Sequence, residues 1–232
     1  MKIKHAMILA AGLGTRMQPL TLKIPKPLLK IGTKSLLERS LALLINHGVD
    51  EISINVHHLA EQIEEFILNF DSKVKINIKD EKKILLDTGG GIKEGTKNFN
   101  DNPFFVINPD TLWNSKYQQD LKSLEQIYFS KKKPCLLLVN KKLSLDKSFT
   151  GDFNIKENII SKDVKNEFIY TGLQIMNKKT LDLINKKIFS MNELWEKLIN
   201  KKDLIGLISN QNFYHLNNFE MYKKILSLKT ID

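Results

Sequence analysis

Two glycines and two cationic side chains follow the first apolar segment of the chain. The segment His5–Ala11 runs into Gly12 and Gly14, and Arg16 and Lys26 come shortly after. A glycine loop after a strand can bring backbone N–H groups close to phosphate oxygens, and nearby cations add fixed positive charge. The segment therefore predicts an anion-binding loop, although two glycines alone suit a tight turn between strand and helix equally well.

Two known phosphate-binding motifs can be tested against this loop. The dinucleotide-binding fingerprint needs a third glycine where Met17 stands. The P-loop needs Gly-Lys followed by Ser or Thr, which the loop lacks. A Rossmann-type dehydrogenase and a P-loop enzyme are therefore both disfavoured.

An acidic side chain follows a second buried strand. The apolar strand predicted at Phe104–Ile107 leads into Asn108, Pro109 and Asp110. Mg²⁺ takes oxygen ligands and bridges phosphates, so Asp110 is a candidate metal ligand. An isolated Asp in this position more often caps a turn, and the residue type alone leaves both interpretations open.

A third group of candidates includes three consecutive glycines. Asp87 and Thr88 precede the run 89–91, which stands before an apparent helix. Such a run suits the close approach of a flat ligand, or an anion at a helix N-terminus. A flexible hinge explains the glycines equally well. His57 and His58 are possible polar neighbours of a ligand, but structural or surface histidines are the more frequent finding.

Composition limits the class of protein. The chain has 232 residues, 42% of them hydrophobic and 27% charged, so a disordered or low-complexity protein is excluded. No apolar run approaches the roughly 20 residues that span a bilayer. The single cysteine, Cys135, cannot form an internal disulfide, and we expect a cytoplasmic protein. The net charge of +10 comes almost entirely from lysines spread along the chain, with only Arg16 and Arg39 as arginines, so we expect no nucleic-acid partner.

Strands and helices alternate along the chain, at a spacing that implies parallel strands with right-handed crossovers. We expect a three-layer, Rossmann-like α/β fold with a mixed central sheet, forming a single domain over residues 1–232. Ligands of such sheets sit outside the carboxyl ends of the strands. The expected strands are His5–Ala11, Glu51–Val56, Val74–Ile78, Phe104–Ile107, Cys135–Val139, Phe168–Met176 and Leu204–Ile208, with a β excursion over Phe149–Ile155 and Asn158–Lys162. The expected helices are Ser35–His47, Leu59–Phe70, Tyr117–Phe129, Asn192–Asn200 and Phe219–Leu228.

The whole string around the first loop is more specific than its glycines. The pattern Gly12-x-Gly14-Thr15-Arg16-x-x-Pro19-x-Thr21, followed by Pro25-Lys26-Pro27, resembles the signature of the sugar-1-phosphate nucleotidyltransferases. The segment Leu85-Leu86-Asp87-Thr88-Gly89-Gly90-Gly91 resembles the compact N-acetylmuramate-1-phosphate uridylyltransferase branch, with Asp87 in place of the usual Glu. Mannose-1-phosphate guanylyltransferases and other hexose-1-phosphate nucleotidyltransferases are the alternative within this family.

The resemblance implies an activity and a set of site residues. It implies that a nucleoside triphosphate, with UTP favoured, and a sugar 1-phosphate, with N-acetylmuramate 1-phosphate favoured, are joined with Mg²⁺ as cofactor and pyrophosphate as product. The nucleotide would lie in the part spanning about residues 1–115 and the sugar in the part spanning about 116–232. The implied residues are Arg16 and Lys26 for catalysis, Ala11, Gly12, Gly14, Thr15, Thr88 and Gly89 for the nucleotide, Asn108, Asp152 and Gly172 for the sugar phosphate, and Asp110 and His215 for the metal.

His215 marks a departure from the family. It stands where the family usually has a second metal-binding Asp, and Mg²⁺ prefers oxygen to nitrogen. Either Asp110, the triphosphate and water hold the ion, or His215 contacts a phosphate. A non-catalytic nucleotide-sensing module therefore stays as an alternative from another class. We expect a monomer or a homodimer, Trp195 in the core, and no assigned role for Lys162 and Lys165.

Overall fold

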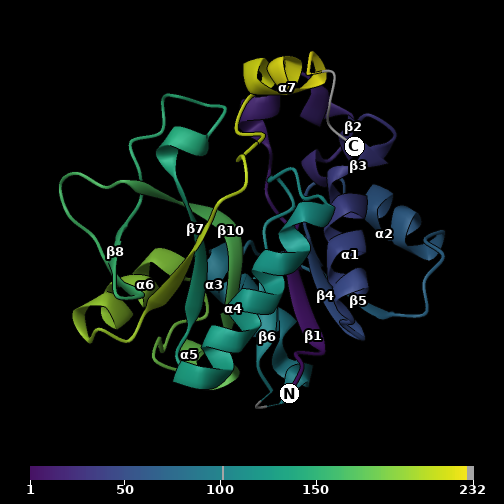
Figure 1. Ribbon diagram of the computed structural model, residues 1–232. Helices are drawn as coiled ribbons and strands as arrows, with labels where there is room; N and C mark the ends of the chain where they lie inside the picture. Colours follow the sequence, from purple (N-terminus) through teal and green to yellow (C-terminus); the bar gives the residue numbers. More distant parts are fainter. Residues whose placement is uncertain (101, 229–232) are drawn as a thin grey trace.

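The computed structural model describes residues 1–100 and 102–228, and its centre is a mixed β-sheet (Figure 1). Within these residues the sheet has nine strands in the order β5-β4-β1-β6-β10-β7-β11-β9-β8. The strands are β1 (His5–Leu9), β4 (Glu51–Val56), β5 (Lys75–Asp80), β6 (Phe104–Ile107), β7 (Cys135–Asn140), β8 (Asn154–Lys156), β9 (Ile159–Ser161), β10 (Phe168–Met176) and β11 (Ile205–Ser209). A separate hairpin pairs β2 (Lys30–Ile31) with β3 (Lys34–Ser35).

The strand directions confirm a mixed sheet with a parallel first half. β1 pairs in parallel with both β4 and β6, and β4 pairs in parallel with β5. β10 runs antiparallel to both β6 and β7, and β11 is again parallel to β7. The carboxyl ends of β1, β4 and β6 consequently meet at one edge of the sheet.

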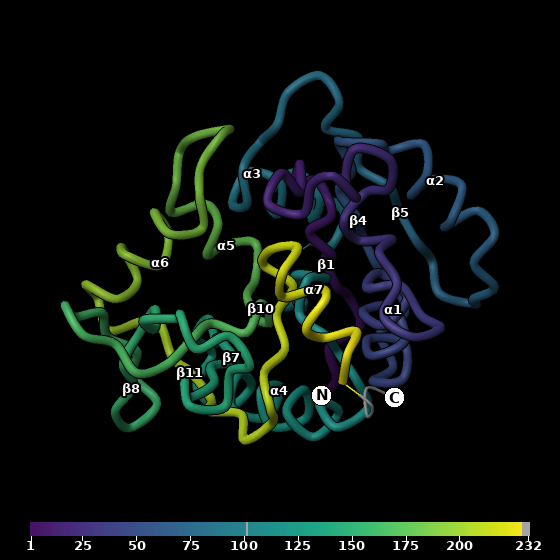
Figure 2. The backbone as a smooth tube through the Cα atoms, turned by 90° about the horizontal axis from the view of Figure 1, so that it is seen from above, coloured from purple at the N-terminus to yellow at the C-terminus, as the bar shows by residue number. Residues whose placement is uncertain are grey.

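Helices cover both faces of the sheet and give three layers, as the sequence predicts. Alternate side chains of β1 point to opposite faces, so that Ala6 and Ile8 pack with α1, α2 and α4 while Met7 packs with α3, α5 and α6. Figure 2 shows β1 between α3 and α4. The helices are α1 (Leu36–His47), α2 (Ala60–Leu68), α3 (Asp87–Gly95), α4 (Gln118–Lys131), α5 (Lys178–Leu181), α6 (Met191–Asn200) and α7 (Phe219–Leu226).

Local sequence signals explain where the main helices begin and end. Ser35 and Ser190 form capping boxes with the Glu three residues later, at the starts of α1 and α6. Gly48 ends α1 in the left-handed conformation, with φ at 96°. The lysine runs at 131–133 and 201–202 lie at helix ends, because Lys132 and Lys201 are the residues that follow α4 and α6.

The C-terminal part of the described chain returns to its beginning. α7 lies beside the β2–β3 hairpin and the N-terminal loop (Figure 1). Met221 and Ile225 of α7 share a buried cluster with Met17 and Ile31. The segment that follows the glycine loop is therefore packed against α7.

Several sequence expectations differ from the structure. The β excursion expected over Phe149–Ile155 is confined to β8 (Asn154–Lys156), and α5 was not expected. The hairpin β2–β3 was not expected, because two-residue strands carry too little alternation to be recognised. The run of glycines was expected before a helix, but α3 begins at Asp87 and contains all three. Trp195 is in the core as expected, 9% exposed and packed against Phe153 and Tyr170.

Candidate active site

A cavity of about 480 Å³ opens beyond the carboxyl ends of β1, β4 and β6. This is the edge at which an open α/β sheet binds its ligands. The cavity brings together most of the residues that the sequence singled out, namely Ala11, Gly12, Gly14, Thr15, Arg16, Lys26, Thr88, Asn108 and Asp110. Gly89, Asp152, Gly172 and His215 lie outside its walls.

The glycine loop after β1 offers unused backbone donors. Gly14 adopts φ of 65°, which favours glycine, and its carbonyl accepts a hydrogen bond of 2.8 Å from Thr21 Oγ1. The N–H groups of Gly12, Leu13 and Gly14 donate to no other residue in the described part of the chain. A Cβ atom at Gly12 would have no atom of another described residue within 4 Å, its two chain neighbours aside. No packing contact among the described residues therefore requires glycine at position 12.

The segment directly after β4 also contacts the loop that follows β1, through His58. The Nε2 atom of His58 lies 2.7 Å from the carbonyl oxygen of Thr21, and His57 Nδ1 lies 2.9 Å from the carbonyl oxygen of Glu81. Both histidines thus contact the backbone of neighbouring segments. This is a structural role, which the sequence analysis gives as more frequent than a ligand contact.

Lys26 and Asp110 form an ion pair at the floor of the cavity. Lys26 Nζ lies 2.6 Å from Asp110 Oδ2, and the side chains are 14% and 22% exposed. Pro25 and Pro27 flank the lysine and restrict the backbone of this short 3₁₀ turn. Burial by itself raises the pKa of Asp110, but Lys26 and His215 outweigh it and lower the pKa to about 2. Asp110 is therefore fully ionised at neutral pH.

His215 reaches the same carboxylate from the C-terminal segment. An antiparallel bridge pairs Thr111 with His215, and it places His215 Nδ1 3.7 Å from Asp110 Oδ1. That Oδ1 atom is buried and has no hydrogen-bond partner among the described residues. Burial lowers the pKa of His215, Asp110 raises it in part, and Lys26 and Arg16 lower it again. The net lowering favours a neutral imidazole, which has a free lone pair on one nitrogen.

The donors around Asp110 are few. Over residues 1–100 and 102–228, no group of three or more His, Cys, Asp and Glu side chains is placed to hold a metal ion. An ion at Asp110 would need further oxygens from a bound phosphate or from water, which is how Mg²⁺ is usually held beside phosphates.

The three glycines of α3 pack against the chain itself. The N–H groups of Gly89 and Gly90 donate to the carbonyl oxygen of Phe189 at 2.9 and 3.1 Å. A Cβ atom at Gly89 would lie 2.3 Å from Phe189 Cε2, and one at Gly90 would lie 2.3 Å from the Lys187 carbonyl oxygen. The absence of side chains at these glycines therefore lets residues 187–189 pack closely on α3. Of the predicted nucleotide contacts Thr88 and Gly89, only Thr88 lines the cavity.

The predicted sugar-side residues lie around Asn108. The Asn108 N–H donates to the Gly172 carbonyl oxygen at 2.8 Å, and a Cβ at Gly172 would lie 2.9 Å from Asn108 Cβ. Gly172 therefore contacts Asn108, which lines the cavity, but Gly172 itself does not line it. Asp152 is exposed and accepts a hydrogen bond of 2.9 Å from the Tyr170 N–H. Partial desolvation of the carboxyl group by the surrounding protein raises the pKa of Asp152, and the Tyr170 N–H and Lys162 offset this only in part.

Two buried polar residues of the cavity have no role assigned to them from the sequence. Asn55 and Glu81 both line it and are only 3% and 4% exposed. Asn55 stands within an alternating strand pattern, and Glu81 stands before two lysines. Only its position directly after β5 could have marked Glu81 as a strand-end residue.

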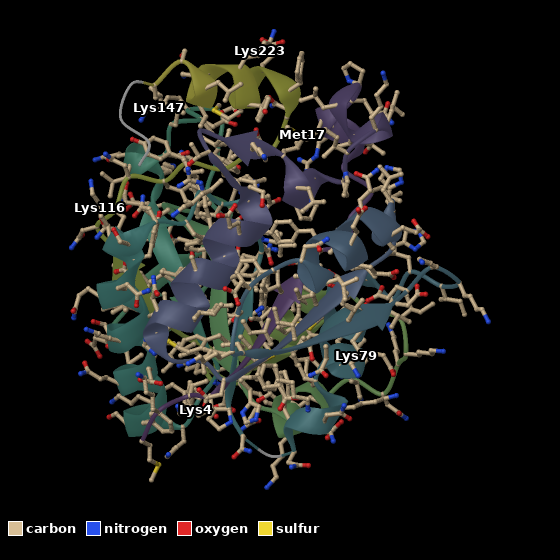
Figure 3. All side chains as sticks on the ribbon, turned by 90° about the vertical axis from the view of Figure 1, so that its right-hand side faces the viewer. Lys4, Met17, Lys79, Lys116, Lys147 and Lys223 are labelled. Atoms are coloured by element: carbon tan, nitrogen blue, oxygen red, sulfur yellow. The ribbon has the colours of Figure 1, made fainter. Side chains whose placement is uncertain are left out.

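Five other lysines of the described chain are far from one another. Figure 3 shows Lys4, Lys79, Lys116, Lys147 and Lys223 on different sides of the molecule. The described residues contain no helix that is long and apolar enough to cross a membrane.

Comparison with known proteins identifies the class that this fold and site define. The nucleotidyl transferase family model matches residues 5–139, which include β1, the glycine loop and Asp110. The chain belongs to the nucleotidyl transferase family.

Individual relatives are sugar-phosphate nucleotidyltransferases. The chain is 30% identical over 223 residues to an N-acetylmuramate alpha-1-phosphate uridylyltransferase of Caulobacter vibrioides, covering 93% of this chain and 92% of the relative. It is 34% identical over 119 residues to a mannose-1-phosphate guanyltransferase of Hypocrea jecorina, covering 50% of this chain and 33% of the relative. A UDP-glucose pyrophosphorylase solved with UDP-glucose shares the fold with a TM-score of 0.80 and 18% identity, covering 97% of both chains.

Proposed function

We propose that this member of the family joins UTP and a sugar 1-phosphate, N-acetylmuramate 1-phosphate in particular, to give a UDP-sugar and pyrophosphate in the cytoplasm. The observation that carries the proposal is the convergence of Arg16, Lys26 and Asp110 on one cavity together with the unused N–H groups of the glycine loop. The match over nearly the full length of the Caulobacter vibrioides uridylyltransferase supports this choice of substrates.

The proposed reaction requires two anions to meet. An oxygen of the sugar phosphate attacks the α-phosphorus of the nucleotide in line, a new P–O bond forms, and the bond to the β-phosphate breaks with its electrons leaving on pyrophosphate. A phosphate monoester has its second pKa near 6, so about half or more is dianionic at neutral pH and no dedicated base is needed. The work of the protein is to position the reactants and to neutralise charge.

Each cation of the cavity has a distinct place in this scheme. Lys26, fixed at the cavity floor by Asp110, offsets the repulsion between the two substrates as they approach. Arg16 is exposed on the loop that follows the unused N–H groups, where it stabilises the charge that develops on pyrophosphate. The loop N–H groups of residues 12–14 hold the triphosphate.

The residues present fit a divalent cation. Asp110 Oδ1, buried and without a partner within the described chain, would hold Mg²⁺, and the His215 nitrogen is near enough to share it. When bound, the ion supplies Lewis-acid stabilisation of phosphate oxygens. Asp110 keeps its charge for this purpose because its pKa is about 2.

The two parts of the chain divide the substrates. The nucleotide lies on the part formed by about residues 1–115, which supplies the glycine loop and Thr88. The sugar lies toward Asn108 and, beyond it, toward the segments carrying Asp152 and Gly172, which belong to the part from about residue 116 onward.

A single panel of reactions tests the proposal. Pyrophosphate release is measured with UTP, GTP, CTP and dTTP, each against N-acetylmuramate, glucose, N-acetylglucosamine and mannose 1-phosphates with Mg²⁺ present. We expect release to be fastest with UTP and N-acetylmuramate 1-phosphate. Fastest release with GTP and mannose 1-phosphate would replace the proposed substrates with the guanylyltransferase alternative. Nucleotide binding without release for any pair would indicate the nucleotide-sensing alternative.

A further inference from the structure

Two walls of the cavity are joined by a buried chain of hydrogen bonds. Asn55 Oδ1 accepts from the Ala10 N–H at 2.8 Å, and Asn55 Nδ2 donates to Glu81 Oε1 at 2.8 Å. Glu81 Oε2 accepts from the Leu86 N–H at 2.9 Å. The chain therefore runs from the residue before the glycine loop to the residue before α3.

Every polar atom at the ends of Asn55 and Glu81 is used in this chain. The two residues are 3% and 4% exposed, so that loss of a hydrogen bond there leaves a donor or acceptor away from water. Both oxygens of Glu81 act as acceptors, which is the pattern of an ionised carboxylate. Its two oxygens accept from Asn55 Nδ2 and from the Leu86 N–H, and no cation among the described residues pairs with it.

Neighbouring residues hold the pair in place. The Glu81 N–H donates to the Val56 carbonyl oxygen at 2.8 Å, which fixes its backbone to β4. At Gly91 of α3, a Cβ atom would lie 2.8 Å from both Asn55 Nδ2 and Glu81 Oε1. The glycine therefore leaves space for the pair, which touches three segments that line or support the cavity.

We propose that Asn55 and Glu81 are positioning residues that set the separation of the glycine loop and the start of α3, and so determine nucleotide affinity. They act through Ala10 and Leu86, without touching the phosphates. The inference deepens the proposed function, because it assigns the fit of the nucleotide part of the cavity to this pair.

The donor and acceptor roles of Asn55 and Glu81 can be exchanged by two substitutions that together leave the net charge of the pair unchanged. This exchange provides the test. In Glu81→Gln the new amide opposes either the Asn55 amide or the Leu86 N–H, so that two donors face each other. In Asn55→Asp two carboxylates face each other. In the double variant, the new carboxylate at position 55 accepts from both the Ala10 N–H and the new amide at position 81. The oxygen of that amide accepts from the Leu86 N–H, which restores every hydrogen bond.

Two readouts follow this cycle. Calorimetry with each of UTP, GTP, CTP and dTTP gives the nucleotide Kd, and amide hydrogen exchange at Ala10 and Leu86 gives the state of the hydrogen bonds without any ligand. We expect each single variant to weaken nucleotide binding about tenfold or more and to speed exchange at both amides. We expect the double variant to return to within about threefold of the wild type in both readouts.

A matched pair elsewhere in the sheet serves as control. Asn77 Nδ2 donates to Glu51 Oε1 at 2.8 Å, and neither residue lines the cavity. The variants Asn77→Asp and Glu51→Gln should leave nucleotide affinity within about twofold, since they disturb an Asn–Glu pair remote from the loop.

Two results would overturn the inference. A double variant that binds nucleotide as weakly as Glu81→Gln would mean that the Glu81 carboxylate meets the ligand directly. If amide hydrogen exchange at Ala10 and Leu86 were unchanged in the single variants, Asn55 and Glu81 would not hold the glycine loop and the start of α3 in place. Failure of the substrate panel leaves the exchange measurement unaffected, so the inference and the proposed reaction can fail separately.

Discussion

Lys26 Nζ lies 2.6 Å from Asp110 Oδ2, although the two residues are 84 positions apart in the chain. The contact joins the loop after β1 to the end of β6, which are neighbouring parallel strands. The topology of the sheet thus creates a cation beside a carboxylate with one oxygen still unpaired within the described chain.

Removing the Lys26 charge should lower turnover. Lys26→Met keeps most of the aliphatic side chain but leaves the two anionic substrates unscreened, and we expect kcat to fall by about 10²–10³-fold. Steady-state pyrophosphate release measures this. Lys23→Met removes an exposed charge from the same segment, outside the cavity, and should leave kcat unchanged. Equal kcat for Lys26→Met and the wild type would remove Lys26 from the reaction.

Arg16 should matter more for turnover than for binding. Its proposed contact is with charge that develops as pyrophosphate leaves, so Arg16→Ala should reduce kcat by about 10²–10³-fold. The nucleotide Kd, measured by calorimetry, should rise less than the rate falls. A variant that keeps full turnover, or loses only affinity, contradicts this role.

His215 should set the affinity for the divalent cation. In His215→Asp an oxygen replaces a nitrogen near Asp110 Oδ1, and we expect Mg²⁺ to bind about tenfold more tightly in the presence of UTP. The Kd for Mg²⁺ and for Mn²⁺ is measured by calorimetry with UTP at saturation. Unchanged Mg²⁺ affinity would place His215 away from the ion and leave it as a phosphate contact.

Two glycines provide a matched test of ligand space against packing. A Cβ at Gly12 would meet no atom of another described residue within 4 Å, so Gly12→Ala should leave the free energy of unfolding nearly unchanged while weakening nucleotide binding. A Cβ at Gly89 meets the Phe189 ring, so Gly89→Ala should lower the free energy of unfolding by about 1–3 kcal/mol. Urea unfolding and calorimetry with UTP separate the two effects, and similar behaviour of the two variants would refute the distinction.

Stability should fall in mildly acidic solution because of His47. The side chain is 3% exposed, with its Nε2 3.5 Å from Glu125 Oε2. Burial lowers the pKa of His47, and Glu125 offsets this only in part. The unfolded chain therefore takes up a proton near pH 6.5 while the folded chain does not, so stability is fully present above about pH 6.5 and declines below it.

The measurement for His47 is urea unfolding from pH 5 to 8. The slope for one proton is at most about 1.4 kcal/mol per pH unit. His47→Gln cannot titrate in this range, so its free energy of unfolding should decline less than that of the wild type below pH 6.5. Parallel curves for the two proteins would show that His47 does not cause the decline.

The fold and the centre of the cavity could be predicted because their signals are local. Strands such as Phe104–Ile107 are continuous apolar runs, and α1 carries both its capping box and its terminal glycine. Parallel strand topology then places the segments after β1 and β6 side by side, which is why Lys26 and Asp110 meet.

The rest of the site depends on contacts between distant segments. The three glycines look the same in sequence whether they meet a ligand or the Phe189 segment, and only the packing of residues 187–189 on α3 decides. Asn55 and Glu81 look like an ordinary strand residue and a surface acid. Their partners are backbone N–H groups, which no residue type in the sequence reveals.

Because α7 packs on Met17 and Ile31, a contact of the N-terminal segment can form only after a late part of the described chain has been synthesised. During synthesis the sheet strands and the glycine loop leave the ribosome before α7, which begins only at Phe219. A nascent chain interrupted before Phe219 contains all nine sheet strands of the described residues, but it presents the glycine loop without its flanking helix. The loop therefore gains its contact with α7 only after the whole sheet has been synthesised.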